Sequence, residues 1–307
     1  MANIGAKITA AGYNNLAAQV NEVFADNHTS SVPTSPVSEK SAGWGNSPAD
    51  LVVTEDVILA DITNQLIDRL NLGTLHTGLE YELTNVTQET ITAQIFTDIS
   101  TVVYALNQVK HIAAPDQLEL ISLVELSNEP SWITTLTFEI EHDFGSYANA
   151  RYYFNSGSSL KLTLDCTGDD AIQLLYAKAG TLNIALKDIT STTPNVIGNN
   201  VGFQGLDSED YILMMTVYAN GGSYGYGYGY GYGYGYGGTG ATVKIYGKIT
   251  ETGLLTIKIE VTDIVEDPKT GIHTITEFAQ HAISKELNGV DFQIGSLTVT
   301  SATVSST

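Results

Sequence analysis

The chain has 307 residues, of which 43% are hydrophobic, and this is enough for one large core or two ordinary ones. Acidic residues outnumber basic ones 34 to 13, and the formal charge of −21 excludes the basic surface that binds nucleic acid or an anionic membrane. Only 15% of the residues are charged, which favours an all-β extracellular or virion protein over a cytosolic enzyme. The single cysteine, Cys166, excludes an intrachain disulfide and a cysteine-based zinc site, and we expect it to be a small buried residue.

The chain shows no targeting segment. No basic stretch followed by an apolar run opens the sequence, so we expect no secretory signal. Nowhere do about 18 apolar residues run together, so we expect no transmembrane helix and no membrane insertion. These features predict a protein that is made in a reducing cytoplasm and leaves the cell by lysis or as part of a particle.

Residues 1–114 are expected to form a helical region for attachment or oligomerisation. Apolar residues at helical spacing predict three helices, over about 8–24, 49–72 and 88–112. We expect Asn14 or Asn15 to cap the first helix and Gly73 to end the second in the left-handed conformation. A turn-rich segment at about 26–48, which contains three prolines, predicts an extended arm or loop.

The first two predicted helices share residues at a fixed distance of 50 positions. The matching pairs are Ile8 and Ile58, Ala10 and Ala60, Asn14 and Asn64, and Leu16 and Leu66. The third helix repeats the pattern more weakly, through Ile91, Ala93, Ile99 and Val103. The matches indicate either a duplicated helical unit or a chance likeness between amphipathic helices.

After Pro115 the hydrophobic period changes from helical to alternating. Every second residue is apolar in most of the predicted strands, which lie at 135–141, 159–165, 211–218, 242–246, 255–261 and 296–300. Glycine, aspartate and asparagine separate these runs at intervals typical of antiparallel sandwiches. The predicted fold class is therefore α+β, with the N-terminal helical region followed by a mainly antiparallel β-sandwich domain at 115–307.

A low-complexity Tyr-Gly repeat occupies 223–238. Its tyrosines alternate with glycine at Tyr224, Tyr226, Tyr228, Tyr230, Tyr232, Tyr234 and Tyr236. Three interpretations stay open: a long loop between two strands, a packing element between neighbouring subunits, or an adhesive surface for glycans or a host protein. These roles do not exclude one another, and all seven tyrosines are candidate binding or assembly residues.

The sequence gives no sign of catalysis or of a cofactor. No two of the six histidines have the i, i+4 spacing of a helical metal site, and we expect them to be packing or surface residues. There is no nucleophile elbow, phosphate-binding loop or dinucleotide fingerprint. The acidic stretch 165–170 fits a solvated turn better than a calcium site, because the EF-hand spacing is absent. Carboxylate pairs for glycoside hydrolysis stay open.

One segment resembles a known protein family. The run Ala150-Arg151-Tyr152-Tyr153-Phe154-Asn155-Ser156-Gly157 is similar to a segment of structural proteins of tailed phages, especially cyanophage-like myoviruses. Four N-terminal motifs are similar in order to the opening region of that family, namely Tyr13-Asn14-x-Leu16, Gly43-Trp44-Gly45, Asn64-x-Leu66 and Leu75-His76-Thr77-Gly78. The resemblance covers about half of the chain. Arg151 is a further candidate assembly residue, because a guanidinium can stack on Tyr147 or Tyr153 and still bind a carboxylate.

The resemblance implies a non-enzymatic structural component of a virion, such as a tail fibre, a collar or neck protein, or a capsid decoration protein. We expect the protein to act as a symmetric homo-oligomer, with a trimer as the first expectation, in contact with other virion proteins and not with nucleic acid. The alternative is an adhesin that binds host-surface glycan through the Tyr-Gly loop. A glycan-degrading tail enzyme is a third, weaker hypothesis.

Overall fold

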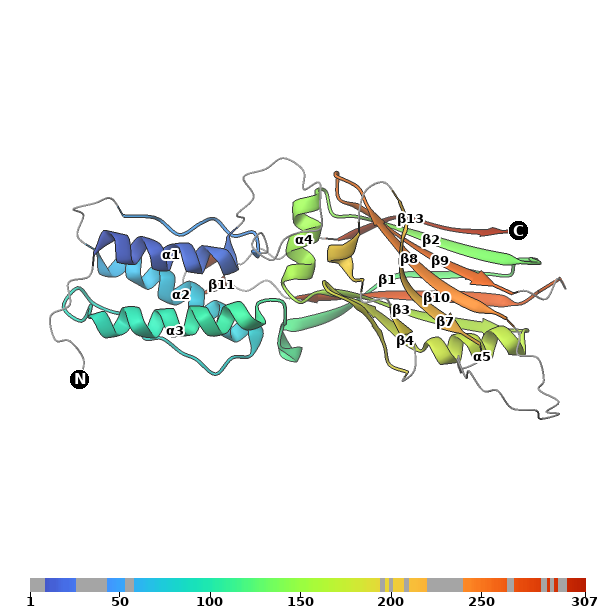
Figure 1. The fold of residues 1–307 in the computed structure, drawn as a ribbon, viewed down its shortest axis with the longest axis horizontal. Helices are drawn as coiled ribbons and strands as arrows, with labels where there is room; N and C mark the ends of the chain where they lie inside the picture. The colour runs from blue at the N-terminus through green and yellow to red at the C-terminus, as the bar shows by residue number, and fades with distance from the viewer. Residues whose placement is uncertain are drawn as a thin grey trace, which may run out of the picture. The chain divides into compact units, whose positions relative to one another are not determined.

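The computed structural model describes residues 9–25, 43–52, 58–193, 197–198, 201–206, 210–219, 240–263, 268–282, 286–287, 290–291 and 297–307. The fold is α+β, with N-terminal helices followed by mainly antiparallel sheets, as the sequence predicts (Figure 1). Two compact units make up the chain: Met1–Glu119 with Ala148–Ser158 and Gln280–Ser296, and Leu120–Tyr147 with Ser159–Ala279 and Leu297–Thr307. No helix in the described ranges has the length and apolarity needed to cross a membrane.

The first unit is built on three helices, α1 (Ala10–Phe24), α2 (Ala60–Thr77) and α3 (Ala93–Val109). It also contains most of α4 (Tyr147–Asn155) and a small hairpin of β11 (Glu286–Leu287) and β12 (Val290–Asp291). The apolar stripes predicted from the sequence face a common core, whose members include Tyr13, Val20, Phe24, Leu66, Leu70, Ile99, Val103 and Leu106. The three long helices therefore pack by the burial of one face each.

The helix ends differ from two of the predictions. Thr9, not Asn14 or Asn15, caps α1, because its side chain accepts a hydrogen bond of 3.1 Å from the Gly12 amide. Helix α2 continues past Gly73 and ends at Gly78, whose φ of 74° is left-handed. Gly73 serves packing instead, since a Cβ there would lie 2.7 Å from Cζ of Phe24.

Asparagines on α1 and α2 each hold an extended segment against their helix. Asn14 accepts from the Val52 amide at 2.9 Å and donates to the Val52 carbonyl at 2.8 Å. Asn64 makes the same two bonds with Val86, at 2.8 Å from the amide and 3.0 Å to the carbonyl. Each asparagine side chain thus makes the two hydrogen bonds that a neighbouring strand would make, and it satisfies the main-chain amide and carbonyl of the residue it contacts.

A second pair of asparagines stands one heptad further along the same helices. Asn21 accepts from the Ala49 amide at 2.7 Å, and Asn71 accepts from the Leu83 amide at 2.8 Å. The helix positions again differ by 50, whereas the extended segments differ by 34. Two shared side-chain clamps at a constant offset support the interpretation that the helical unit is duplicated, with connections of different length.

We predict that Asn64→Ala lowers the free energy of unfolding of the first unit by about 2 kcal/mol, because the Val86 amide and carbonyl lose their partners. Urea denaturation followed by Trp44 fluorescence measures this, since the second unit contains the other tryptophan, Trp132. The control is Asn85→Ala, an exposed position beside Val86, where we expect a change within about 0.5 kcal/mol. Equal effects of the two substitutions would contradict the clamp.

The second unit consists mainly of two sheets. One has the strand order β1-β10-β3-β4-β5 and contains β1 (Leu118–Asn128), β10 (Ile272–Ala282), β3 (Ser159–Thr167), β4 (Thr181–Ile184) and β5 (Ile189–Ser191). The other has the order β13-β2-β9-β8-β7-β6 and contains β13 (Thr298–Ser306), β2 (Thr135–Asp143), β9 (Leu254–Thr262), β8 (Thr242–Ile249), β7 (Ile212–Tyr218) and β6 (Ile197–Gly198). Helix α5 (Asp170–Ala179) packs against β3, β7 and β8.

Alternation along the strands builds the interior of the sandwich. Every second residue of β2, β8 and most of β9 is buried, while the residues between them are partly exposed. The register aligns these buried residues across the sheet, for example Ile140 with Ile257 and Phe138 with Ile259. The β-sandwich therefore forms where the alternating pattern predicts it, with β1, β4, β5, β6, β10 and α5 added to the predicted elements.

Candidate functional site

Among the candidate binding or assembly residues, Arg151 lies within the described part of the chain. Tyr224, Tyr226, Tyr228, Tyr230, Tyr232, Tyr234 and Tyr236 lie outside the described residues. Arg151 lies on α4, where its side chain is fully buried and the guanidinium carbon is 5.4 Å from the ring centroid of Tyr152. In the single chain Arg151 is therefore part of the internal packing of the first unit.

Three of the five segments in which the sequence resembles phage structural proteins meet around Trp44 in the first unit. The Trp44 indole donates to the carbonyls of Lys110 at 2.8 Å and Asn155 at 3.2 Å. The Asn155 side chain in turn donates to the Gly43 carbonyl at 3.1 Å. The Gly43-Trp44-Gly45 motif and the α4 motif are more than 100 positions apart in the sequence, yet they share these buried hydrogen bonds.

His76 joins the same cluster from the end of α2. Its ring stands edge-on to that of Trp44, with centroids 4.9 Å apart, and its Nε2 lies 2.8 Å from the Ser156 carbonyl. Burial lowers the pKa of His76. A carbonyl can only accept, so Nε2 carries the proton and donates it, and His76 acts as a neutral hydrogen-bond donor that fixes the main chain after α4.

Two glycines of these motifs allow the close approach. Gly45 has a φ of 81°, and a Cβ there would lie 2.6 Å from the Tyr152 ring. Gly157 has a φ of 85°, and a Cβ there would lie 2.5 Å from the Ala113 amide nitrogen. Both positions require glycine for conformation and for space. Three of the motifs therefore form one tightly packed group of Gly43–Gly45, His76 and Tyr152–Gly157, which we call the Trp44 cluster.

A cysteine and a histidine lie close together in the second unit. Sγ of Cys166 on β3 is 3.9 Å from Nε2 of His273 on β10, and Nδ1 of His273 is 3.0 Å from the Tyr176 hydroxyl on α5. A nucleophilic cysteine needs a thiolate, which a neighbouring imidazolium stabilises. Burial instead raises the pKa of Cys166 to about 11 and lowers that of His273 to about 4. Both groups are neutral near pH 7 and fully buried, so they act in packing, as expected for Cys166.

The acidic stretch 165–170 forms a strand end and a helix cap. The Asp169 carboxylate accepts from the amides of Ala171 at 3.0 Å and Ile172 at 3.1 Å, and it thereby caps α5. Asp165 accepts from the Cys166 amide at 2.8 Å. In the described part of the chain, no group of three or more His, Cys, Asp or Glu side chains is arranged to hold a metal ion.

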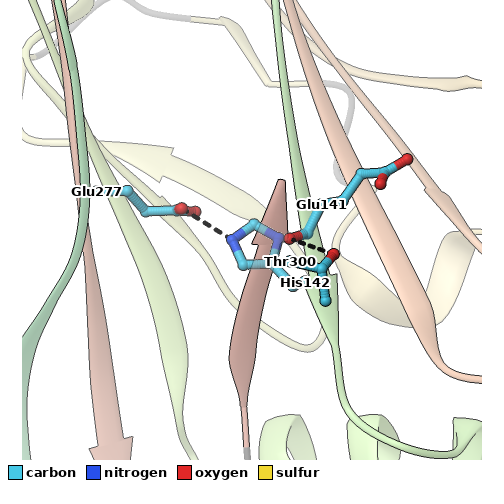
Figure 2. A network of polar contacts seen from close by, with 4 residues as sticks. All are labelled: Glu141, His142, Glu277 and Thr300. Carbon is cyan, nitrogen blue, oxygen red and sulfur yellow. Dashed lines mark hydrogen bonds and ion pairs between the residues drawn. The ribbon is translucent and has the colours of Figure 1, made fainter. Parts of the chain in front are cut away.

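A buried histidine and a buried glutamate join the two sheets. Nε2 of His142 on β2 lies 2.8 Å from Oε2 of Glu277 on β10, and both side chains are fully buried (Figure 2). The neighbouring Glu141 points to the other side of β2 (Figure 2). Its main-chain carbonyl accepts from the Thr300 hydroxyl at 3.3 Å, and its carboxylate accepts from Ser301 at 2.8 Å.

The His142–Glu277 pair is suited to holding the sheets together, not to acid–base chemistry. The hydrogen bond between the imidazole and the carboxylate offsets part of the cost of burying both groups between two apolar sheets. A substrate would need contact with one of the two groups, and neither is accessible in the single chain. The alternation of Leu136, Phe138 and Ile140 places His142 on the inner face of β2. The buried position of His142 can therefore be predicted from the sequence pattern.

We predict that His142→Leu and Glu277→Leu each lower the free energy of unfolding of the second unit by about 3–5 kcal/mol, because each leaves one buried polar group unpaired. The double variant should lose less than either single variant, since no unpaired group remains. Urea denaturation followed by Trp132 fluorescence measures the cycle, with Glu141→Gln, on the other face of β2, as a control that changes little. Additive losses in the double variant would rule out the coupling.

We also predict a pH effect from His273. Its pKa is about 4 in the folded protein and about 6.5 when unfolded, so between these values the unfolded chain binds a proton that the folded chain does not. This contribution to stability is complete above pH 6.5 and is lost as the pH falls to 4, by up to about 3 kcal/mol. His273→Gln should remove it, so wild type should lose more stability than the variant between pH 7 and pH 4. If the stability of wild type and of His273→Gln changes equally with pH, burial does not lower the pKa of His273.

A scan against protein-family models found no match, and searches of the curated proteins and of the solved structures found no significant match either.

Proposed function

We propose that this protein is a non-enzymatic structural component of a tailed-phage virion and that it acts as a symmetric homo-oligomer. The proposal covers three types of virion component: a fibre, a collar or neck protein, or a capsid decoration protein. The proposal includes contacts with other virion proteins and a location in the virion.

The observation that carries the proposal is the Trp44 cluster. Three of the motifs that resemble phage structural proteins, Gly43-Trp44-Gly45, the His76 motif and the α4 motif, meet there through hydrogen bonds and close glycine contacts. Motifs that are scattered along a sequence by chance have no reason to contact one another. Their convergence supports a resemblance that reflects a shared folding unit.

The chemistry of the buried polar residues supports the non-enzymatic part of the proposal. His76 donates to a main-chain carbonyl, and His142 pairs with Glu277 between the sheets. His273 is neutral and shares a hydrogen bond with Tyr176. Each of these three groups has a structural partner, and all are buried. Such groups give a rigid scaffold, which a virion component requires.

Two measurements test the proposal. Mass photometry of the full chain at micromolar concentration should show an oligomer, with a trimer at three times the 32.8 kDa of the chain as the expected species. Immunogold labelling of gradient-purified particles of the encoding virus should place the protein on the virion at a symmetric location. A chain that is only monomeric would contradict the homo-oligomer, and unlabelled particles would contradict the virion role.

A further inference from the structure

One side of the sandwich is bounded by two long edge strands. β1 has 11 residues and ends one sheet, and β13 has nine residues and ends the other. Their neighbours β10 and β2 face each other, because Glu277 and His142 are in contact at 2.8 Å. Helix α5 joins the opposite flanks of the sheets through β3 on one and β7 and β8 on the other, so the two edges lie on the same side of the sandwich.

The inner face of β1 is mainly apolar and remains partly or largely exposed. The Ser127 hydroxyl contacts that of Thr274 at 3.2 Å, and Thr274 alternates with the buried His273 and Ile275 on β10. Ser127 therefore points outward, and alternation directs Leu126, Val124 and Leu120 toward the interior. Not one residue of β1 is buried, and Leu120 is 58% exposed.

The inner face of β13 has the same character. Val299, Ala302 and Val304 stand in register with the buried His142, Ile140 and Phe138 of β2, so they too face the interior. All three are nevertheless partly exposed, as is the rest of the strand. We define the open seam as the inward-facing apolar residues of the two edges: Leu120, Val124, Leu126, Val299, Ala302 and Val304.

The other strands of the sandwich have more cover. Helix α5 packs against β3 of one sheet and β7 and β8 of the other, and it buries Ile172, Leu175 and Tyr176. The edge strands β5 and β6 have only three and two residues. Long apolar edges without cover are a source of unwanted pairing in soluble proteins, which normally protect them with charges, prolines or a covering element. The open seam contains no charged residue and no proline, and no helix or strand within the described ranges buries it.

We infer that the open seam packs against β1 and β13 of further copies of this chain around a symmetry axis. This inference rests on the proposed homo-oligomer and assigns its contact surface. The two strands have 11 and nine residues, and the six residues of the open seam lie on their inward faces. Their aliphatic side chains supply the apolar area that such contacts bury.

Charge favours a second copy as the occupant. The chain carries a formal charge of −21, so two copies repel one another over most of their surface. The open seam is uncharged, β13 contains no charged residue, and the two acids of β1, Glu119 and Glu125, alternate with the seam residues. A basic partner would be drawn to the acidic surfaces instead, whereas like-charged copies can approach where the charge is absent.

The same charges indicate how the copies are arranged. Contact of β1 with β1 would bring four glutamates together, whereas β1 against β13 of the next copy places the two glutamates beside an uncharged strand. Because both edges lie on the same side of the sandwich, this pairing can occur twice in a two-fold dimer or once per contact in a ring of three or more copies.

The test compares two adjacent substitutions on β1. Leu120→Lys places a charge in the open seam, while Ile121→Lys, at a position that is 40% exposed, places the same charge on the other face of the strand. We expect Leu120→Lys to weaken self-association at least tenfold and Ile121→Lys to leave it nearly unchanged, as measured by mass photometry over a concentration series. Val304→Lys should reproduce the loss from the β13 side. Circular dichroism and the thermal midpoint of each variant verify the fold.

The outcomes separate this inference from the proposed function. An oligomer that dissociates with Leu120→Lys and Val304→Lys, but not with Ile121→Lys, supports the open seam as the interface. An oligomer that survives both seam substitutions, with the fold retained, overturns the open seam and leaves the homo-oligomer intact. A wild-type chain that is only monomeric overturns both and leaves the open seam to a different protein.

Discussion

The second unit depends on the alternation of side chains along its strands. Because successive residues point to opposite faces, each strand directs every second side chain into the space between the sheets. Phe138, Ile140 and His142 follow this rule on β2, as do Ile275 and Glu277 on β10. The same alternation holds in the edge strands β1 and β13, which also direct apolar side chains inward, yet no residue of either strand is buried. The alternation of side chains therefore produces both the buried interior of the sandwich and the exposed apolar residues of the open seam.

The buried imidazoles of His142 and His273 are tolerated because each one makes a hydrogen bond with another buried side chain. An unpaired polar group in an apolar interior costs free energy, so His142 with Glu277 and His273 with Tyr176 are arranged as pairs. In the first unit, Asn14 and Asn64 pair with the main chain of extended segments. These interactions specify which segments lie together, and apolar contacts supply most of the stability.

The sequence predicted the parts of the fold that have a strong period. The three N-terminal helices and strands β2, β3, β7, β8 and β9 were found because their burial repeats with a helical or an alternating period. Helix α4 was not predicted, since only nine residues form it and its interior packing involves Arg151 and Asn155. The inner face of β10 contains His273, Ile275 and Glu277. Because two of these three buried residues are polar, the alternating apolar pattern that predicts a strand is absent from the sequence. Gly73 was assigned to a helix end because a close contact with Phe24 cannot be seen in one sequence.

The polar sites were harder to predict than the fold. His142 pairs with Glu277 from a strand 135 positions later, and only the topology of the sheets brings them together. The 50-residue offset, in contrast, was visible in the sequence, although the clamping role of Asn14 and Asn64 was not. Matching residues indicate that two segments are related, but they do not reveal what each residue contacts. The same limit applied to the phage-like motifs before their contacts around Trp44 were known.

The central claim is that this protein acts by self-association through the uncovered edge of its sandwich. Hydrogen–deuterium exchange of the β1 and β13 main-chain amides, measured at a concentration that favours the oligomer and again after dilution, tests it most directly. We expect slow exchange in both strands at high concentration and faster exchange in both after dilution, with the central strand β9 unchanged. Exchange in β1 and β13 that is fast and independent of concentration would contradict the claim.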